Sequence, residues 1–188
     1  MRIVAGRYRG RRLKAPEGES TRPSSDKTRE SLFNILEAGR FGDGGSLVRG
    51  ARVLDAFAGT GALGLEALSR GAAEVTFVEN TAPALTALRA NLKTLEAEDA
   101  CRVIDGDVLR LPRAASAHSI ALLDPPYRQG LAAPALQRLA DGGWLAPGAI
   151  AVVELMKAED FEAPERFGPL DERVYGKAKL IFLRYAPG

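Results

Sequence analysis

From residue 50 onward the chain alternates short apolar runs with helical stretches, and this alternation constrains its fold more than any other feature of the sequence. Five apolar runs have the length and composition of buried strands, at 52–57, 75–79, 101–104, 120–123 and 150–155. Stretches with helical periodicity lie between them, including 62–69, 84–95 and 131–139. Strands that are buried on both faces and joined by helical crossovers predict a parallel, doubly wound α/β sheet.

The end of the chain departs from this alternation. The strand-like runs 171–175 and 180–185 are separated by only a few residues around Gly176. That gap is too short for a crossover helix, so we expect the last pair of strands to be antiparallel. A mostly parallel, seven-stranded sheet whose last strand enters antiparallel resembles the Rossmann-like fold of class I methyltransferases.

The composition is that of an ordinary globular protein, with 46% hydrophobic and 27% charged residues. No apolar run approaches the length needed to cross a bilayer, and no apolar stretch follows the N-terminal charges. We therefore expect a cytoplasmic protein without a membrane partner. Cys101 is the only cysteine and His118 the only histidine, which excludes an internal disulfide and a Cys/His zinc cluster, so we expect no metal. We interpret both as core or strand-edge residues.

The first 14 residues hold all of the excess positive charge. The chain has a net charge of +2, but the part after residue 14 contains 20 basic and 24 acidic side chains. The first segment has no acid and six bases: Arg2, Arg7, Arg9, Arg11, Arg12 and Lys14. Such a cluster is a candidate phosphate-contacting surface, although a solvated edge has the same composition.

The same segment is expected to be ordered. Apolar residues alternate with the basic ones, and Gly6 and Gly10 are potential turn-formers, which favours a small β-hairpin over a tail. A helix is predicted next, with residues 24–26 as candidate N-caps and Gly39 at its end. With 188 residues the chain has the size of one domain with an appendage. We expect residues 1–40 to form the appendage and residues 41–188 the main domain.

A strand, a glycine-rich turn and a helix start follow one another at 53–64, which is typical of a ligand-binding loop. Two interpretations compete. Gly59, Gly61 and Gly64 match G-x-G-x-x-G, and Glu79 stands twenty residues after the first glycine, as in nicotinamide dinucleotide sites. However, Asp55 ends the first strand, where its carboxylate would repel a pyrophosphate and would suit the ammonium of a methionine group.

Acids end three successive strands, at Asp55, Glu79 and Asp107, and this pattern resembles the S-adenosylmethionine site of class I methyltransferases. The resemblance assigns Asp55 and the turn Gly59, Thr60 and Gly61 to the methionine part of the cofactor. It assigns Glu79 to the ribose and Asp107 with Val108 to the adenine. We include Phe57 and Asn80, which lie beside these residues, among the candidate cofactor contacts. Alternatively, some of the acids only cap helices or end strands.

The segment Asp124-Pro125-Pro126-Tyr127 follows the apolar strand 120–123, so it lies at a carboxyl end of the sheet, where ligands of α/β folds bind. The two prolines stiffen the loop, leaving the Asp124 carboxylate and nearby carbonyls as a fixed set of acceptors. Acceptors that hold the hydrogens of an exocyclic base amine can aim its lone pair at a sulfonium methyl. Tyr127 can stack on the base. We therefore assign all four residues to catalysis, Asp124 to orientation first and proton acceptance second.

Four blocks together resemble the RsmD family of bacterial 16S ribosomal RNA guanine-N2 methyltransferases: 2–10 (RIVAGRYRG), 21–26 (TRPSSD) with 29–36 (RESLFNIL), 54–70, and the loop 124–127. The resemblance spans nearly the whole chain. It implies a guanine of 16S rRNA as target, presented in a partly assembled small ribosomal subunit. Ser24 stands where the family usually has Thr, and Asn80 where a charged residue is common.

The resemblance also implies that the N-terminal hairpin contacts RNA and that the turn at 22–26 closes over the cofactor. We expect a monomer whose RNA-binding residues include Arg7, Arg9, Arg11, Arg12, Lys14 and Arg22.

Three other functions compete with this interpretation. An N6-adenine methyltransferase shares the chemistry of Asp124 to Tyr127, but the short chain lacks a second DNA-reading domain. A nicotinamide-dependent oxidoreductase is kept open by the glycine pattern and Glu79. A non-catalytic RNA-binding protein would leave the loop 124–127 unexplained.

Overall fold

The computed structural model describes residues 1–16, 26–42 and 44–188. The helices are α1 (Asp26–Glu37), α2 (Ala62–Ser69), α3 (Ala82–Leu95) and α4 (Ala132–Asp141), with short 3-10 helices η1 (Glu98–Ala100) and η2 (Val108–Arg110). The strands are β1 (Arg52–Asp55), β2 (Glu74–Glu79), β3 (Cys101–Asp105), β4 (His118–Leu123), β5 (Leu145–Met156), β6 (Phe167–Tyr175) and β7 (Ala178–Tyr185). Each predicted strand and helix is therefore present.

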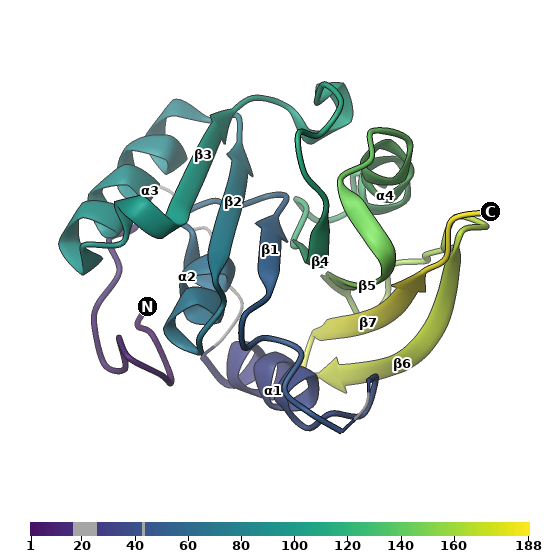
Figure 1. Cartoon of the computed structure of the whole chain (residues 1–188), viewed down its shortest axis with the longest axis horizontal. Coiled ribbons are helices and arrows are strands. Elements are labelled where there is room, and N and C mark those ends of the chain that lie inside the picture. The colour runs from purple at the N-terminus through teal and green to yellow at the C-terminus, as the bar shows by residue number, and fades with distance from the viewer. Residues whose placement is uncertain (17–25, 43) are drawn as a thin grey trace.

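The seven strands form one sheet in the order β3-β2-β1-β4-β5-β7-β6 (Figure 1). The first five are parallel, and β7 inserts antiparallel between β5 and β6. This confirms the predicted fold of a class I methyltransferase, including the antiparallel last strand. The β4–β5 pairing contains an irregularity, because the register shifts between His118 and Ile120.

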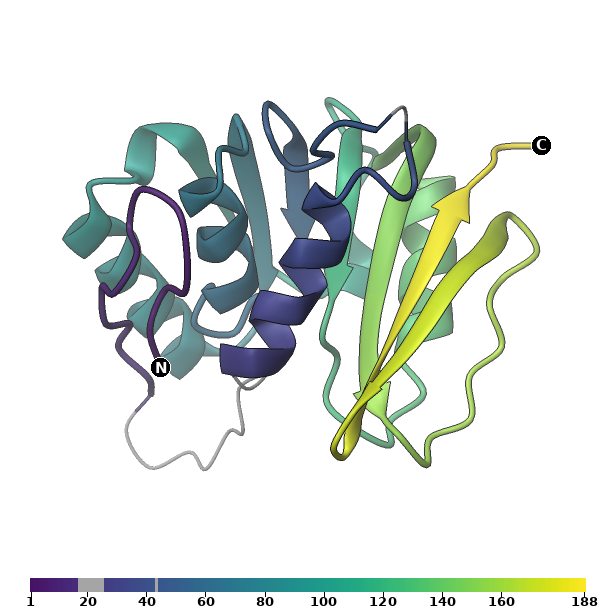
Figure 2. The same ribbon diagram turned by 90° about the horizontal axis from the view of Figure 1, so that it is seen from below.

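Each face of the sheet has its own hydrophobic core. Side chains of α1, α2 and α3 pack on the face that carries Val53, Phe77 and Phe182. Residues of α4 and η2 pack on the other face, against Leu54 and Leu123. Neighbouring residues of β1 thus point to opposite cores, as the two-residue period of a strand requires. Figure 2 shows α1 crossing one face between α2 and the β7–β6 end of the sheet.

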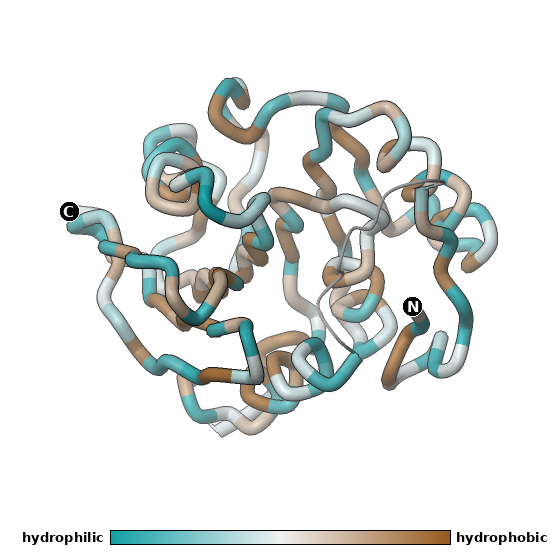
Figure 3. Tube along the Cα trace, turned by 180° about the vertical axis from the view of Figure 1, so that it is seen from behind, coloured by the Kyte–Doolittle hydropathy of each residue, from teal (hydrophilic) through white to brown (hydrophobic). Residues whose placement is uncertain are grey.

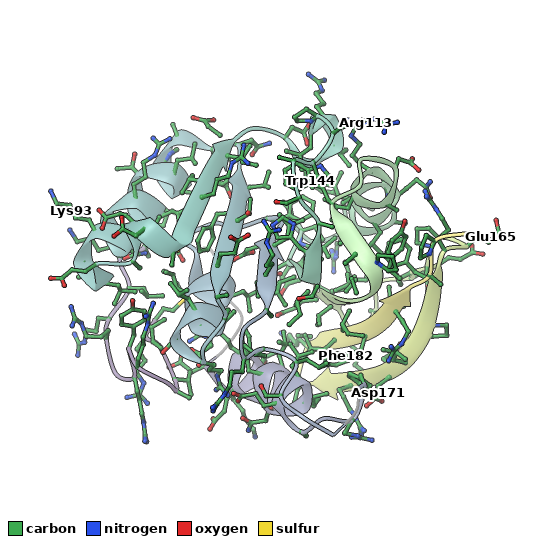
Figure 4. All side chains as sticks on the ribbon, in the orientation of Figure 1. Lys93, Arg113, Trp144, Glu165, Asp171 and Phe182 are labelled. Atoms are coloured by element: carbon green, nitrogen blue, oxygen red, sulfur yellow. The ribbon has the colours of Figure 1, made fainter. Side chains whose placement is uncertain are left out.

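The figures agree with this burial pattern. In Figure 3 the strands at the centre are mostly apolar, and the peripheral loops are mostly polar. Figure 4 shows Phe182 and Trp144 within the molecule, whereas Lys93 and Arg113 point outward.

The N-terminal segment, residues 1–14, folds back on itself and lies against α2 and α3. Arg2 and Arg12 form an antiparallel bridge, and the backbone N–H groups of Ile3 and Gly10 donate to Arg11 O and Ile3 O at 3.0 and 2.9 Å. The expected hairpin is therefore present as a short paired loop. Ile3 and Leu13 are buried in the same core as α2 and α3. The proposed domain boundary at residue 40 stays a prediction.

Helix α1 is present where it was expected. It begins at Asp26, one of the candidate caps, while Ser24 and Ser25 lie outside the described residues. Gly39 has a φ of 67° and follows the end of the helix. This positive φ fits a glycine that terminates a helix.

His118 and Cys101 have the roles in the core and at the strand edge that the sequence predicted. His118 is 2% exposed, and its Nδ1 and Nε2 contact Trp144 O and Thr76 Oγ1 at 3.1 and 3.0 Å. Burial lowers the pKa of His118 and raises the pKa of the partly buried Cys101 thiol to about 12. Neither group is poised for catalysis.

Two searches over the described part of the chain bear on membranes and metals. No helix there is long and apolar enough to cross a membrane. Nor do the same residues contain a cluster of three or more His, Cys, Asp or Glu side chains that could hold a metal ion.

Candidate active site

The candidate site lies at the edge of the sheet formed by the carboxyl ends of its parallel strands. Asp55 is in register with Leu122, and the backbone N–H of Ala56 donates to Leu122 O at 2.9 Å. On the other side of β1, the N–H of Ala58 donates to Val78 O at 3.0 Å. The glycine-rich loop after β1 is thereby held between the ends of β2 and β4. The structure places the loop 124–127 next to it.

Asp55 is buried at the base of this edge, with 1% of its surface exposed. Its Oδ2 accepts a hydrogen bond from Gly64 N at 2.9 Å, in the first turn of α2. Its Oδ1 has no hydrogen-bond partner among the residues that the structure describes. Burial raises the pKa of Asp55 from 3.8 to about 7, opposed by the Gly64 hydrogen bond and assisted by the charge of Glu79. A cation placed at Oδ1 would relieve this desolvation.

Glycine is suited to each of the three positions in the loop for a different local reason. Gly59 has a φ of 53°, and a Cβ there would meet no atom within 4 Å, so its side-chain position opens toward empty space. Gly61 has a φ of 83°, and a Cβ would lie 2.4 Å from Leu88 Cδ1. At Gly64 a Cβ would lie 2.3 Å from Phe77 Cε1, so this glycine permits close packing of α2 on β2. Only Gly59 leaves room for a ligand beside its backbone.

Glu79 joins the glycine-rich loop to the start of α3. Its Oε2 accepts from Gly59 N at 2.8 Å. Its Oε1 accepts from the backbone N–H groups of Asn80 and Thr81 at 3.0 and 2.8 Å and from the Thr81 hydroxyl at 2.8 Å. Since each carboxylate oxygen has two lone pairs, Oε2 can still accept one ribose hydroxyl. Asn80 is exposed beside it.

Asp107 and Val108 lie after β3. Asp107 Oδ1 caps η2 by accepting from Leu109 N at 2.9 Å, and its Oδ2 lies 3.8 Å from Arg110 Nε. The sequence left open that some of these acids only cap helices, and Asp107 does cap a helix with one of its two carboxylate oxygens. Val108 is buried, and Phe57 packs partly buried against the core that contains Val108.

The loop 124–127 starts half-buried and ends exposed. Asp124 is partly buried and Pro125 is buried, whereas Pro126 is exposed and 36% of Tyr127 is exposed. Burial raises the pKa of Tyr127, and the nearby charge of Asp124 and a hydrogen bond to Glu154 add to the increase. The ring of Tyr127 is thus held at one end while enough of it is exposed to contact a ligand.

Glu154 is a site residue that the sequence did not reveal. It is 2% exposed near the carboxyl end of β5, the strand beside β4. The signal available was a single acid within the otherwise apolar run 149–155. A buried carboxylate at the ligand-binding edge of a sheet is unusual enough to mark it.

The candidate RNA-binding residues that the structure describes lie on the N-terminal segment, which packs against α2 and α3. Arg7, Arg9, Arg11, Arg12 and Lys14 are all exposed. The Arg7 guanidinium lies 4.4 Å from the centre of the Tyr8 ring, and Arg11 Nη2 donates to Thr94 O at 2.8 Å. Arg22 lies outside the described residues. The structure brings the five others together on one short segment.

Buried polar side chains that the sequence did not single out hold this segment in place. Glu66 accepts from the N–H groups of Val4 and Ala5 at 2.7 and 3.0 Å. Asn91 accepts from Lys14 N at 2.7 Å and donates to Thr60 O at 3.0 Å, which links the segment to the glycine-rich loop. Both residues are almost fully buried.

Known proteins resemble the chain over nearly its full length. Residues 1–184 match the family model described as Conserved hypothetical protein 95. Ribosomal RNA small subunit methyltransferase D of Escherichia coli (strain K12) is 41% identical over 155 residues, which cover 82% of this chain and 74% of that protein. The protein of the same name from Haemophilus influenzae is 36% identical over 180 residues, 94% of this chain and 89% of that protein.

A solved structure gives the same result for the fold. The putative methyltransferase yhhF from Escherichia coli superposes with a TM-score of 0.85 at 36% identity, covering 100% of this chain and 99% of that one. The sequence resemblance noted above is thus confirmed, and the chain belongs to the RsmD family.

Proposed function

We propose that this protein transfers a methyl group from S-adenosylmethionine to the exocyclic N2 amine of a guanine in 16S ribosomal RNA. The observation that carries the proposal is the position of the loop 124–127 beside the glycine-rich loop, at the carboxyl ends of the adjacent strands β4 and β1. This arrangement puts a stiff set of acceptors next to the open side of Gly59 and the buried carboxylate of Asp55. Membership of the RsmD family supports an rRNA substrate, because relatives carry the name ribosomal RNA small subunit methyltransferase D.

The residues at the glycine-rich loop fit the cofactor. The unpartnered Oδ1 of Asp55 suits the ammonium of its methionine part, and the open side of Gly59 admits it close to the backbone of Gly59, Thr60 and Gly61. Glu79 keeps one lone pair for the ribose, with Asn80 alongside. Asp107 Oδ2 and the backbone of Val108 are suitable for the adenine, with Phe57 nearby. When bound, the cofactor supplies an electrophilic methyl group on a sulfonium.

The loop 124–127 supplies the positioning for methyl transfer. The lone pair of a base amine is delocalised into the ring, so the amine is a poor nucleophile until acceptors such as the Asp124 carboxylate hold its hydrogens and turn the lone pair toward the methyl group. Tyr127 stacks on the base, and the prolines keep the two side chains at a fixed spacing. The N–C bond forms as the S–C bond breaks. The amine nitrogen, now cationic, then loses a proton to Asp124 or to water.

We further propose that residues 1–40 act as an RNA-contacting appendage, with Arg7, Arg9, Arg11, Arg12, Lys14 and Arg22 among its contacts. The exposed cations of the N-terminal segment can neutralise phosphates without reading sequence. The substrate is then 16S rRNA in a partly assembled small ribosomal subunit, bound by a monomer.

One assay separates this function from its competitors. Purified protein is incubated with methyl-labelled S-adenosylmethionine and small-subunit rRNA from cells that lack the protein, either free or in particles, and with duplex DNA. Digestion and mass spectrometry identify the modified base. We expect N2-methylguanine in RNA, whereas N6-methyladenine would contradict the base assignment. Calorimetry with S-adenosylhomocysteine and with NAD tests the cofactor, and binding of only NAD would support the oxidoreductase.

A further inference from the structure

Arg128, the residue after Tyr127, has a backbone conformation that side chains rarely adopt. Its φ is 61°, in the left-handed region. Among the described residues, Glu96 is the only other non-glycine residue with a positive φ, and it caps the end of α3, where that conformation is common. Twelve glycines in the described ranges have a positive φ, including Gly130 two residues later. Glycine would adopt this conformation with less strain. The presence of an arginine at this position therefore indicates that its side chain has a function.

Glu159, on the loop after β5, holds this conformation. Its Oε2 accepts a hydrogen bond from Arg128 N at 3.2 Å. Glu159 is itself fixed, because its N–H donates to Met156 O at 2.9 Å and its carbonyl accepts from Lys179 Nζ at 2.5 Å. The same loop is tied to the β6–β7 turn by Lys157 N, which donates to Lys177 O at 2.7 Å. The turn at Arg128 is therefore stabilised by contacts, through Glu159, with residues of β5 and β7 that lie outside the loop 124–130.

The guanidinium of Arg128 is available to a ligand. Residues 126–130 are all exposed, and the Arg128 side chain makes no ion pair or hydrogen bond with any residue that the structure describes. Its surroundings are acidic, since the charges of Asp124, Glu154 and Glu159 all act on Tyr127. An RNA backbone that approached Tyr127 would meet the negative charge of Glu159, whose Oε2 lies 3.2 Å from Arg128 N. Arg128 is a cation of the same loop that can offset this charge.

We propose that Arg128 binds a phosphate next to the target nucleotide and that Glu159 is the positioning residue that aims it. This inference rests on the proposed function and names a substrate contact within the same site. A base that enters a methylation pocket leaves its own phosphates outside, at the mouth. Arg128 lies one residue beyond the ring on which the base stacks, and its guanidinium can take two oxygens of one phosphate. The N-terminal cations contact RNA from another segment of the chain, whereas Arg128 fixes the strand beside Tyr127.

The Arg128→Gly variant separates the cation from the turn. Glycine adopts the left-handed conformation without strain, so the midpoint of thermal unfolding should stay the same or rise. The KM for free, unmethylated small-subunit rRNA should rise about tenfold at low salt, and the slope of log affinity against log salt should fall by about one. Arg128→Lys keeps the charge and should lose less. The control is Arg113→Gly, an exposed arginine in the loop that leads into the amino end of β4, which should leave the KM unchanged.

A double-mutant cycle tests Glu159. Glu159→Ala should raise the KM for RNA in the wild-type background, because the Arg128 contact is no longer aimed. It should not raise the KM in Arg128→Gly, where that contact is already lost and only the repulsion by the Glu159 carboxylate is removed. A purely structural role would give additive effects and a lower unfolding midpoint in every background. The proposal is overturned if Arg128→Gly methylates RNA with the KM and salt dependence of the wild type. If the wild type transfers no methyl group to RNA, the proposed function fails instead.

Discussion

Glu66 Oε2 accepts a hydrogen bond from the backbone N–H of Val4 at 2.7 Å, across 62 residues of chain. The other oxygen of Glu66 accepts from Ala5 N at 3.0 Å and from Arg70 Nε at 2.9 Å, and Arg29 Nε lies 3.5 Å from Oε2. The carboxylate is fully buried. A single side chain of α2 therefore binds the N-terminal segment, α1 and its own helix.

Replacing Glu66 with Gln should destabilise the whole protein. The change removes the negative charge from a buried site that contains two arginines and turns an amide toward backbone N–H groups that need an acceptor. We expect a loss of about 3 kcal/mol in the free energy of unfolding, measured by urea denaturation. Glu37→Gln is the matched control, because Glu37 also pairs with Arg70 but its side chain is 34% exposed. It should cost under about 1 kcal/mol, and equal losses would contradict the central role of Glu66.

Gly6 and Gly10 provide a second matched pair. Both have a positive φ, 79° and 82°, but a Cβ on Gly6 would lie 1.9 Å from Ser69 O, whereas a Cβ on Gly10 would meet nothing within 4 Å. Gly10→Ala should cost only the conformational strain, about 1 kcal/mol. Gly6→Ala should cost roughly 2 kcal/mol more, because the segment must move away from α2. Amide hydrogen exchange at Arg7, whose N–H donates to Ser69 O at 2.8 Å, should accelerate only in Gly6→Ala.

Asp55 should make the protein without cofactor less stable as the pH rises. Its pKa is about 7 in the folded protein against 3.8 as the unperturbed value. Between these values the folded protein keeps a proton that the unfolded chain has released, so the free energy of unfolding falls as pH increases and levels off above about pH 7. Asp55→Asn removes this titration and should be more stable than the wild type at pH 8, by roughly 4 kcal/mol at most. Denaturation at pH 5 and pH 8 measures the difference.

The cofactor supplies the second readout for Asp55. Binding of an ammonium at Oδ1 stabilises the ionised carboxylate, so S-adenosylhomocysteine should bind more weakly below pH 7 and release a proton when it binds there. Calorimetry in buffers of different ionisation enthalpy measures that proton. Asp55→Asn should bind the same ligand at least tenfold more weakly. An Asn variant with wild-type affinity would remove Asp55 from the cofactor site.

Asp124→Asn should abolish most of the methyl transfer while leaving the cofactor in place. One acceptor oxygen is replaced by an amide donor that faces the hydrogens of the target amine, so we expect kcat to fall about 100-fold or more. Single-turnover methyl incorporation measures this step. The affinity for S-adenosylhomocysteine should stay within about twofold, because Asp124 follows β4, whereas the proposed cofactor contacts lie at the ends of β1, β2 and β3. Retained turnover would sink the assignment of Asp124.

Neutralising Arg9, Arg11 and Arg12 together should weaken RNA binding and flatten its dependence on salt. Each phosphate contact that is lost should lower the slope of log affinity against log salt by about 0.7 to 0.9. Filter binding at several salt concentrations gives the slope. The double variant Arg102→Ala/Arg113→Ala removes exposed cations near the amino ends of β3 and β4 and should change neither quantity. An unchanged slope in the triple variant would show that these arginines are solvated surface charges that do not contact RNA.

Local sequence patterns predicted most of the fold because the strands are apolar runs and the helices have clear limits. Residues 62–69 were expected as a helix and form α2 with the same bounds. The start of β5 was missed: it begins at Leu145, although Pro147 and Gly148 within it are residues that usually interrupt strands. The register shift that accommodates this stretch depends on β4, a neighbour that no local pattern shows.

The candidate site was predictable in outline for the same reason. Asp55 and Glu79 end recognisable strands and Asp124 directly follows one, and parallel strands bring their carboxyl ends to one edge. The sequence does not show that Asp55 Oδ2 accepts a hydrogen bond from α2 while Oδ1 has no partner among the described residues. This difference depends on the geometry of the first turn of α2. Glu66 and Asn91 carry no local signal, because their partners lie far away in the chain. The signal for Glu154 is a single acid in an apolar run, and its partner Tyr127 belongs to the loop after the neighbouring strand β4.

The long reach of Glu66 and Asn91 also sets an order of events during synthesis. Residues 1–14 leave the ribosome before either partner exists, and Lys14 meets Asn91 only across a separation of 77 residues. The segment must therefore remain unpaired until α2 and α3 have formed, since the entropy of closing so long a loop is recovered only by contacts with the finished helices. A chain caught part-way through synthesis would carry its cations on an unstructured strand. The proposed RNA-contacting surface therefore takes its shape late, only after the core beneath it has formed.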